Sequence, residues 1–327
     1  MSGRRVLVTG AAGYLGSRLV ASLAARKAAG RSIDCIVASD LREVPADRRL
    51  PGVEYAALDV RDPGLVDILT HHRVDAVVHL AAIVTPGAKP DRELEFAVDV
   101  LGTKNVLDSC VAAGTQKIIV TSSGAAYGYH ADNPAWLTES DPIRGNEEFA
   151  YSHHKRLVEE MLAEYRNTHP ALQQVIFRVG TILGETTRNQ ITALFDRPRL
   201  IAIRGSASPF VFIWDVDVVG AIEHALDTDR TGIYNVAGDG ALSIQEIAAR
   251  LGKRCLTLPP WLLRGVLAVL HPLGLSQYGP EQVNFLRYRP VLDNRRLKDD
   301  FGYCPQLNSA EVFDLYCRSH GLGRHAQ

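Results

Sequence analysis

The sequence predicts an α/β fold: a doubly wound parallel sheet with a smaller C-terminal lobe interleaved with it. Up to about residue 180, short apolar runs alternate with longer runs of helical apolar spacing. The short runs are almost continuously apolar, as strands are when helices cover both faces of a parallel sheet. The 327 residues are 46% hydrophobic, which suffices for a large core and excludes a disordered or collagen-like chain.

The expected elements follow a regular order up to Gly180. Strands are expected at 4–10, 32–40, 53–58, 74–82, 116–123 and 173–180, and helices at 14–29, 93–113 and 151–167. Beyond Gly180, strand-like runs at 200–205, 209–214 and 232–238 mix with helical runs at 215–226, 243–251 and 261–270. We expect residues 1–180, with parts of 205–237, to form the main domain, and 181–204 with 238–327 mainly the smaller lobe.

Charge and cysteine content exclude several classes of protein. The chain has 36 Lys and Arg against 37 Asp and Glu, so no basic excess points to a nucleic-acid partner. Its five cysteines include no CxxC pair, and an odd, scattered set suits the reducing cytoplasm better than a disulfide framework. The N-terminus runs directly into a strand, so no signal peptide is expected. These features predict a cytoplasmic protein.

The most apolar later stretch, 259–275, is interrupted by Arg264, His271 and Pro272. Its uninterrupted part is shorter than the ~20 residues that a membrane span needs. A buried or interface helix is the favoured interpretation, and a helix on a membrane surface is the alternative. No membrane partner is expected.

The strongest local motif joins the first strand to the first helix. VTGAAGYLG at 8–16 places Gly10, Gly13 and Gly16 where a sharp turn and the close approach of a pyrophosphate leave no room for Cβ atoms. The amides and dipole at the helix start supply positive charge for the phosphate. Asp40 ends the second strand, where a carboxylate binds the adenosine ribose hydroxyls. Together they predict a dinucleotide site.

The same residues bear on which nucleotide is bound. Asp40 would repel the 2′-phosphate of NADP and so favours NAD, although Arg42 offers a phosphate partner nearby. The structural alternative is that Asp40 only starts a turn. No GxxxxGK[ST] run is present, which excludes an ATP or GTP P-loop, while a methyltransferase stays open at this point.

A catalytic set follows in the middle of the chain. Tyr151 and Lys155 lie four positions apart, on the same face of a helix. A free phenol is a poor acid–base catalyst near neutral pH, and a neighbouring ammonium group favours the phenolate. The strand end at 119–128 is rich in hydroxyls, including Ser123, at the edge where parallel sheets bind ligands. One such hydroxyl can orient the oxygen whose carbon gains or loses a hydride.

Taken together, these residues resemble the extended short-chain dehydrogenases/reductases of the NAD-dependent epimerase/dehydratase family. The resemblance covers about residues 4–250. Its motifs, in the family's order, are TGAAGYLG at 9–16, Asp40, Leu58-Asp59-Val60, His79-Leu80-Ala81-Ala82, Gly102-Thr103, SSGAAYG at 122–128, YSHHK at 151–155, Arg178, Asp217 and YNVAG at 234–238. It implies a Rossmann-type fold and an NAD-dependent enzyme.

The resemblance assigns roles residue by residue. It implies that Ser123, Tyr151 and Lys155 are catalytic, with Tyr151 as the acid–base group. The implied cofactor site comprises Gly10, Gly13, Tyr14, Leu15, Gly16, Asp40, Leu41, Asp59, Val60, Leu80, Ala81, Ala82, Tyr151 and Lys155. The main domain would bind NAD and the smaller lobe the substrate. Family members commonly pair through two long helices, here 93–113 and 151–167, so a homodimer is expected, with contacts among Val98, Leu101, Leu157, Val158 and Met161.

Departures from the family pattern bear on the substrate. Gly124 and Ala125 stand where dehydratases have acidic residues, so dehydration is not expected. Phe210 replaces an arginine that grips the diphosphate in nucleotide-sugar enzymes, and Asp99 replaces an asparagine. Replacement cations are available at Arg204, Arg287 and Arg289.

The expected reaction is therefore hydride transfer between NAD and a secondary alcohol or ketone carbon of a small molecule without a nucleotide diphosphate. A nucleotide-sugar epimerase with tightly bound NAD and a redox-sensing protein with a vestigial site are the alternatives. The expected substrate-binding residues are Ser123, Gly124, Thr181 and Phe210, with Ile182, Leu183 and Trp214 as further liners.

The adjacent histidines offer no metal site by their spacing. His71-His72 and His153-His154 have no Cys or carboxylate at ligand spacing, so no metal is expected.

Overall fold

A seven-stranded parallel sheet forms the centre of the computed structural model, which describes residues 3–84, 91–273 and 279–323. Its strand order is β10-β6-β5-β4-β1-β2-β3. The strands are β1 (Arg4–Thr9), β2 (Ile33–Asp40), β3 (Glu54–Ala57), β4 (Ala76–His79), β5 (Lys117–Ser123), β6 (Gln173–Val179) and β10 (Gly232–Val236). The predicted doubly wound α/β fold of Rossmann type is confirmed.

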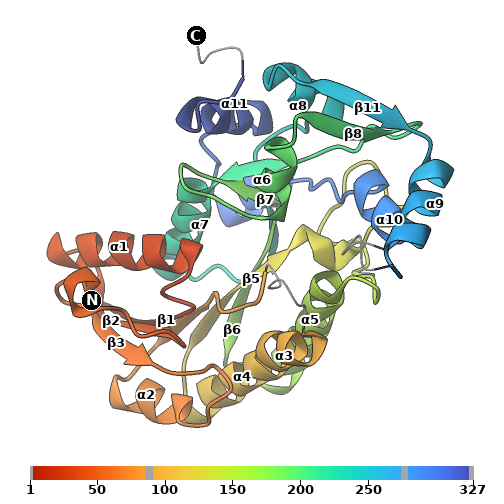
Figure 1. The fold of residues 1–327 in the computed structure, drawn as a ribbon. Coiled ribbons are helices and arrows are strands. Elements are labelled where there is room, and N and C mark those ends of the chain that lie inside the picture. Colours follow the sequence, from red (N-terminus) through yellow and green to blue (C-terminus); the bar gives the residue numbers. More distant parts are fainter. Residues whose placement is uncertain (1–2, 85–90, 274–278, 324–327) are drawn as a thin grey trace.

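Helices cover both faces of this sheet, as Figure 1 shows. On one face lie α1 (Tyr14–Ala28) and α7 (Asp215–Asp227), and on the other α2 (Leu65–His71), α4 (Gly102–Ala113) and α5 (Ala150–Thr168). Alternate residues of β1 serve the two faces: Val6 and Val8 pack with α1 and α7, and Leu7 packs with the other three helices. Both faces are thus buried, which explains the continuously apolar strands.

The helix expected at 93–113 has an irregular middle. α3 (Arg92–Phe96) continues into a π-helical turn, Ala97–Leu101, before α4 begins at Gly102. The apolar spacing runs on through this turn, so it could not be predicted from the sequence. The turn buries Asp99 and Val100, and such π turns are frequent at functional sites.

The later part of the chain adds two small parallel sheets beside the main one. β7 (Thr181–Leu183) pairs with β9 (Phe212–Trp214), and β8 (Arg199–Ile203) pairs with β11 (Arg254–Leu258). The surrounding helices are α6 (Gln190–Phe195), α8 (Ile244–Arg250), α9 (Pro260–Leu270), α10 (Gln282–Arg287) and α11 (Ser309–Ser319). Short helical turns lie at Ala46–Arg48, Gly124–Tyr127 and Leu297–Phe301. An aromatic cluster built around Phe195, Phe212 and Phe313 forms the core of this part.

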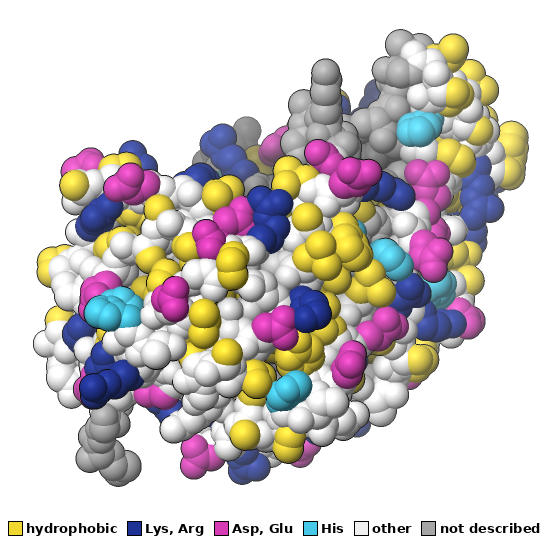
Figure 2. Space-filling model, turned by 90° about the horizontal axis from the view of Figure 1, so that it is seen from below, with side chains coloured by type: hydrophobic (Ala, Val, Ile, Leu, Met, Phe, Trp, Pro, Cys, Tyr) yellow, Lys and Arg dark blue, Asp and Glu magenta, His cyan; other side chains and the backbone are white. Residues whose placement is uncertain are grey.

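The surface carries no dominant charge on the face seen from below, where side chains of both signs are scattered among apolar ones (Figure 2). This distribution matches the balanced composition of the chain. Within the described residues, no helix combines the length and apolarity needed to cross a bilayer.

Candidate active site

In the glycine loop between β1 and α1, neighbouring backbone comes so close that there is no room for side chains at two of the glycines. Gly10 has φ +67°, and a Cβ there would lie 2.8 Å from the amide nitrogen of Ala81. A Cβ on Gly16 would lie 2.1 Å from the carbonyl oxygen of Gly10, so α1 packs on the loop only because residue 16 has no side chain. Gly13 caps α1 without a side-chain hydrogen bond, which leaves the first amides of the helix free to face an anionic group.

Asp40 lies against this loop, as predicted, at the carboxyl end of β2. Its carboxylate accepts hydrogen bonds from the amides of Ala12 and Arg42, each at 3.0 Å. The Arg42 Nε lies 3.4 Å from the same carboxylate, and its side chain is 69% exposed. Asp40, which favours NAD, and Arg42, which could bind the 2′-phosphate of NADP, therefore lie side by side in the site.

The residues expected around the adenine differ in exposure. Val60 is buried, and a Cβ on Gly102 would come within 2.8 Å of its Cγ2. Asp59 binds Arg61 at 2.6 Å, and this ion pair lowers the pKa of the carboxyl group. Leu41, also predicted to contact the cofactor, has an exposed side chain.

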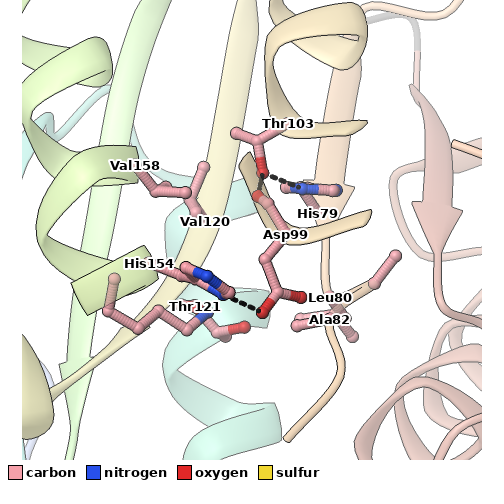
Figure 3. A pocket seen from close by; sticks show the side chains of 11 residues that line it. His79, Leu80, Ala82, Asp99, Thr103, Val120, Thr121, His154 and Val158 are labelled. Atoms are coloured by element: carbon pink, nitrogen blue, oxygen red, sulfur yellow. Dashed lines mark hydrogen bonds and ion pairs between the residues drawn. The ribbon is translucent and has the colours of Figure 1, made fainter. Parts of the chain in front are cut away.

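A buried polar network shares the lining of a small cavity with Leu80, Ala81 and Ala82 (Figure 3). The two ring nitrogens of His79 hydrogen-bond to the Thr9 and Thr103 hydroxyls at 2.8 and 2.9 Å. Burial, aided by the Lys155 cation, lowers the pKa of His79 to about 3. His79 is therefore a neutral structural bridge between β1, β4 and α4.

Asp99 and His154 form a second buried pair beside it. The His154 Nδ1 lies 3.1 Å from one Asp99 oxygen, and the amide of Ile83 donates to the other at 2.8 Å. Sequence reasoning placed His154 as an isolated surface or core residue, but α5 and the π turn bring it against Asp99. A cavity of about 10 Å³ between this pair, Thr121 and Lys155 has room for about one water molecule.

The three predicted catalytic residues come from two adjoining elements. Ser123 ends β5, and its hydroxyl oxygen accepts a hydrogen bond from the Ala125 amide at 3.1 Å. In α5, the Lys155 Nζ lies 5.6 Å from the centre of the Tyr151 ring and donates to the Thr121 carbonyl at 2.9 Å. The Ser152 hydroxyl donates to the Ala125 carbonyl at 2.6 Å, which fixes α5 against the turn that follows Ser123.

A buried ion pair holds these elements from behind. The Arg178 guanidinium binds both oxygens of Glu159, and the Ser122 hydroxyl donates to the same carboxylate at 2.5 Å. Although burial opposes the charge, Glu159 and Tyr127 raise the pKa of Arg178 above its ordinary value. β5, β6 and α5 are thereby tied together next to Ser123.

Of the expected substrate-side residues, Thr181 and Ile182 are half-buried, and a Cβ on Gly124 would contact Leu292 at 3.1 Å. Leu183 and Trp214 lie in the core of the C-terminal part, so they support the fold rather than line an open pocket.

Phe210 stacks on Phe212, with ring centres 5.7 Å apart, and is 3% exposed. Its other contact was not predicted: the Arg289 guanidinium carbon lies 4.0 Å from the Phe210 ring centre and 4.5 Å from that of Phe285.

Arg289 lies at this side of the site and forms no ion pair with the part of the chain that the structure describes. Its Nε and Nη2 atoms are buried without a hydrogen-bond partner among the described residues, and burial lowers its pKa to about 10. The ring centres of Tyr129 and Phe285 lie 4.8 Å apart. Arg289 and Tyr151 both lie close enough to Tyr129 to affect the pKa of its hydroxyl. These residues come from distant parts of the chain. The sequence suggested Arg289 only as one of three possible replacements for the missing arginine at position 210.

An open cavity of about 550 Å³ lies next to this aromatic group. Its lining includes Tyr129, Asn146, Arg264, Asn284 and Tyr288. It offers room for a small molecule between the 129–148 segment and helices α9 and α10.

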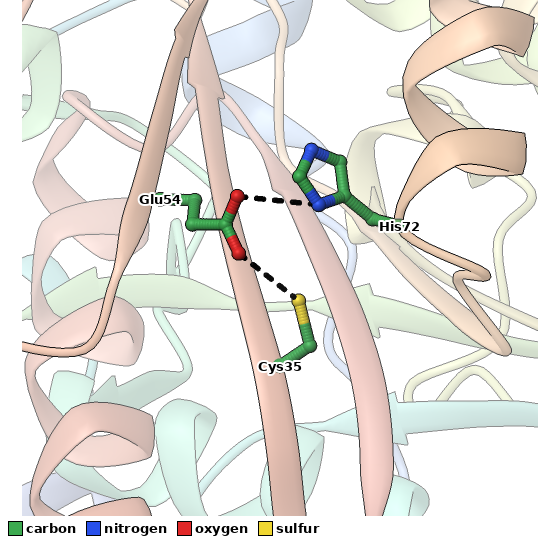
Figure 4. Close-up of side chains that lie close together, drawn as sticks. All are labelled: Cys35, Glu54 and His72. Atoms are coloured by element: carbon green, nitrogen blue, oxygen red, sulfur yellow. Dashed lines mark hydrogen bonds and ion pairs between the residues drawn. The ribbon is translucent and has the colours of Figure 1, made fainter.

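A cluster of Cys35, Glu54 and His72 differs from what the sequence spacing predicted. Sequence spacing gave the His71-His72 pair no Cys or carboxylate, yet the structure places Cys35 and Glu54 beside His72 (Figure 4). The Cys35 thiol lies 3.8 Å from one Glu54 oxygen, and the His72 Nδ1 lies 3.3 Å from the other. Burial raises the pKa of the Cys35 thiol, and the nearby Arg5 and Lys27 cations disfavour a bound dication.

Comparison with known proteins gives one family match. The model of the NAD dependent epimerase/dehydratase family matches residues 6–237. An uncharacterized protein of Mycobacterium tuberculosis is 26% identical over 97% of this chain and 84% of its own length. A UDP-glucose 4-epimerase of Erwinia amylovora is 30% identical over 57% of this chain and 56% of its own length.

Solved structures share the fold. The Thermus thermophilus UDP-glucose 4-epimerase in complex with NAD superposes with a TM-score of 0.72 at 24% identity, covering 96% of this chain and 98% of that one. A dTDP-glucose 4,6-dehydratase from Bacillus anthracis in complex with NAD gives 0.73 at 17% identity, covering 97% and 96%.

Proposed function

Because the chain belongs to the NAD-dependent epimerase/dehydratase family of extended short-chain dehydrogenases/reductases, we propose that it is an NAD-dependent oxidoreductase acting on a secondary alcohol or ketone carbon. The observation that carries this proposal is the convergence of Ser123, Tyr151 and Lys155 from β5 and α5 beside a glycine loop. When bound, the cofactor supplies a hydride acceptor or donor.

The cofactor site fits NAD on structural grounds. Side chains at Gly10 or Gly16 would fill the space along the loop, and the first amides of α1 are uncapped. Gly10, Gly13 and Gly16 would hold the pyrophosphate, Asp40 the adenosine ribose, and Ala81 and Ala82 would line the nicotinamide side. Asp40 favours NAD over NADP because two anionic groups would share one corner.

In the proposed mechanism, the Tyr151 hydroxyl holds and releases the proton of the reacting oxygen. Lys155 would bind the ribose next to the nicotinamide. The Thr121 carbonyl orients the Lys155 ammonium group, which lies 5.6 Å from the centre of the Tyr151 ring. Ser123 donates a hydrogen bond to the reacting oxygen. No acidic side chain stands at Gly124 or Ala125, so elimination of water is not proposed.

Arg289 favours a second candidate, a nucleotide-sugar epimerase. A buried guanidinium with unpaired nitrogens is a costly arrangement that an anionic substrate group would relieve. Two incubations separate the candidates: epimer formation from UDP-sugars without added cofactor identifies the epimerase, and NADH formation from an alcohol with added NAD⁺ identifies the dehydrogenase.

Replacing Tyr151 with Phe tests the chemistry that both candidates share. We expect turnover to fall by ~10²–10⁴, as for loss of an acid–base group, while NAD affinity stays within about two-fold. Tyr165→Phe is the control, because Tyr165 lies on the same helix but its hydroxyl donates to Asp108, away from the proposed site. An unchanged rate in the Tyr151 variant would overturn the assignment.

A further inference from the structure

Helix α9 exposes an apolar face to solvent. Leu262, Val266 and Val269 follow one another at helical spacing and are 39%, 43% and 61% exposed. Trp261, in the first turn, is 72% exposed. On the opposite side of the helix, Leu263 and Leu267 pack on Ile203, so the position of α9 is fixed while its outer face has no cover among the described residues.

The β8–β11 ribbon, whose strand β11 leads directly into α9, also exposes apolar side chains. Ile201 and Leu256 are paired in the parallel register and are 45% and 44% exposed. Two positions earlier, on the same side of the ribbon, Arg199 is paired with Arg254, and both are exposed. We call the exposed set the α9 patch: Ile201, Leu256, Trp261, Leu262, Val266 and Val269. Figure 1 shows the ribbon and α9 together at one end of the molecule.

The two chain segments that form the α9 patch carry charge of one sign. Residues 197–214 and 251–280 contain no Asp or Glu, although the whole chain has a net charge of -1. The exposed cations of these two segments are Arg197, Arg199, Arg204, Arg254 and Arg264. An apolar helix face with a tryptophan and a rim of arginines has the composition of a helix that lies in a membrane interface.

We propose that the α9 patch docks this protein on an anionic lipid bilayer. The apolar side chains would enter the boundary between headgroups and acyl chains, and the arginines would pair with acidic headgroups. α9 is too short to span the bilayer, so the protein lies on the surface. A second copy of the chain fits less well, because pairing two such patches would place arginines opposite arginines without an acid between them.

Flotation of the full chain with vesicles tests this directly. We expect binding to phosphatidylcholine vesicles that contain phosphatidylserine, little binding to phosphatidylcholine alone, and a loss of binding as salt is raised. Emission of Trp261 should shift to the blue on binding, because its ring leaves water. Absence of binding to the anionic vesicles would overturn the proposal.

Two sets of variants separate the contributions. Arg199→Ala with Arg254→Ala should weaken binding about twenty-five-fold, at about five-fold for each exposed arginine removed. Trp261→Ser with Val269→Ser should weaken it at least about ten-fold, whereas Trp136→Ser, which changes another exposed tryptophan, should not. Equal binding by all variants, or dissociation of a dimer by the Trp261 change, would overturn the proposal in favour of nonspecific adsorption or self-association.

Discussion

At the scale of single residues, the site depends on buried polar groups whose partners lie far away in the chain. The sequence identified Asp99 as a departure from its family and found Tyr151, Lys155 and the glycines, because their spacing is local. It did not pair Asp99 with His154, which lies 55 positions later, or bring Arg289 to Phe210. Spacing predicts neighbours within one helix or turn, whereas these contacts are made by packing between elements.

Acid should destabilise the fold through His79. Its pKa of about 3 in the folded protein lies below the ~6.5 of an unfolded chain, because burial disfavours the cation. The unfolded chain therefore takes up the proton first. The contribution of neutral His79 to the free energy of unfolding is fully present above pH ~6.5. It is lost as the pH falls toward 3, by up to ~1.4 kcal/mol for each pH unit.

Urea unfolding of wild type and His79→Gln measures this contribution. The wild type should lose stability between about pH 6 and 5 more steeply than the variant. Parallel curves for the two proteins would show that His79 is protonated in the folded state.

Cofactor preference should depend on Asp40. Replacing it with Ala removes the carboxylate that would oppose a 2′-phosphate and leaves Arg42, now without its carboxylate partner, to bind one. We expect NADPH affinity to rise at least about ten-fold and NADH affinity to fall, as measured by fluorescence titration. Arg42→Ala is the control and should lower NADPH affinity alone. Tighter NADPH than NADH binding by the wild type would contradict the preference for NAD.

At the scale of elements, the long strands and helices were predictable to within a few residues. Continuous apolar runs and helical spacing mark β1, β2, β5, β6, α1 and α5. The short elements β7, β11, α2, α6 and α10 were not predicted, since three to seven residues carry little periodicity. The eleven-residue α11 is the exception among the longer helices, because it was not predicted either. β11 forms because it pairs with β8 more than fifty positions earlier, a contact that no local pattern contains.

Tyr14 links two of these elements, α1 and α7, to the loop at 184–189. Its hydroxyl donates to Asp215 at the start of α7 and accepts from Thr187 at 2.7 Å, and burial raises its pKa to about 12. Tyr14→Phe should lower the free energy of unfolding by about 1–3 kcal/mol, because Asp215 then loses a buried partner. It should also speed hydrogen exchange of the amides at 184–189.

Tyr234→Phe provides the matched control. It removes a single hydroxyl bond, to the Thr231 carbonyl, on the far edge of the sheet. It should leave exchange at 184–189 unchanged. Equal exchange in both variants would mean that Tyr14 does not hold this segment.

At the scale of the whole molecule, exposed apolar side chains are available for the contact of the expected homodimer. The predicted contact Val158 is 3% exposed and packs in the core of its own chain, so it is not available to a partner. Leu94, Phe96 and Leu101, in α3 and the π turn, are 43%, 37% and 50% exposed. Pairing through these helices across a twofold axis would cover them.

We therefore expect a dimer that depends on Leu101. Sedimentation at micromolar concentration should give about twice the 35.8 kDa mass of the chain, and Leu101→Glu should give the monomer because it places a charge in an apolar contact. Val216→Glu, at a similarly exposed apolar position on α7, should remain dimeric. A wild-type monomer would count against the pairing.

The strand order has a consequence for how the chain folds during synthesis. β10 completes the sheet beside β6, and Leu297 and Phe301 fill the core between β10 and α7. Six strands can therefore leave the ribosome while one edge and one face of their sheet still lack cover. Such contacts between distant positions form slowly, and the exposed edge of β6 is open to pairing with other chains until residue 236 has emerged. The last third of the chain must therefore emerge before the sheet and its core are complete.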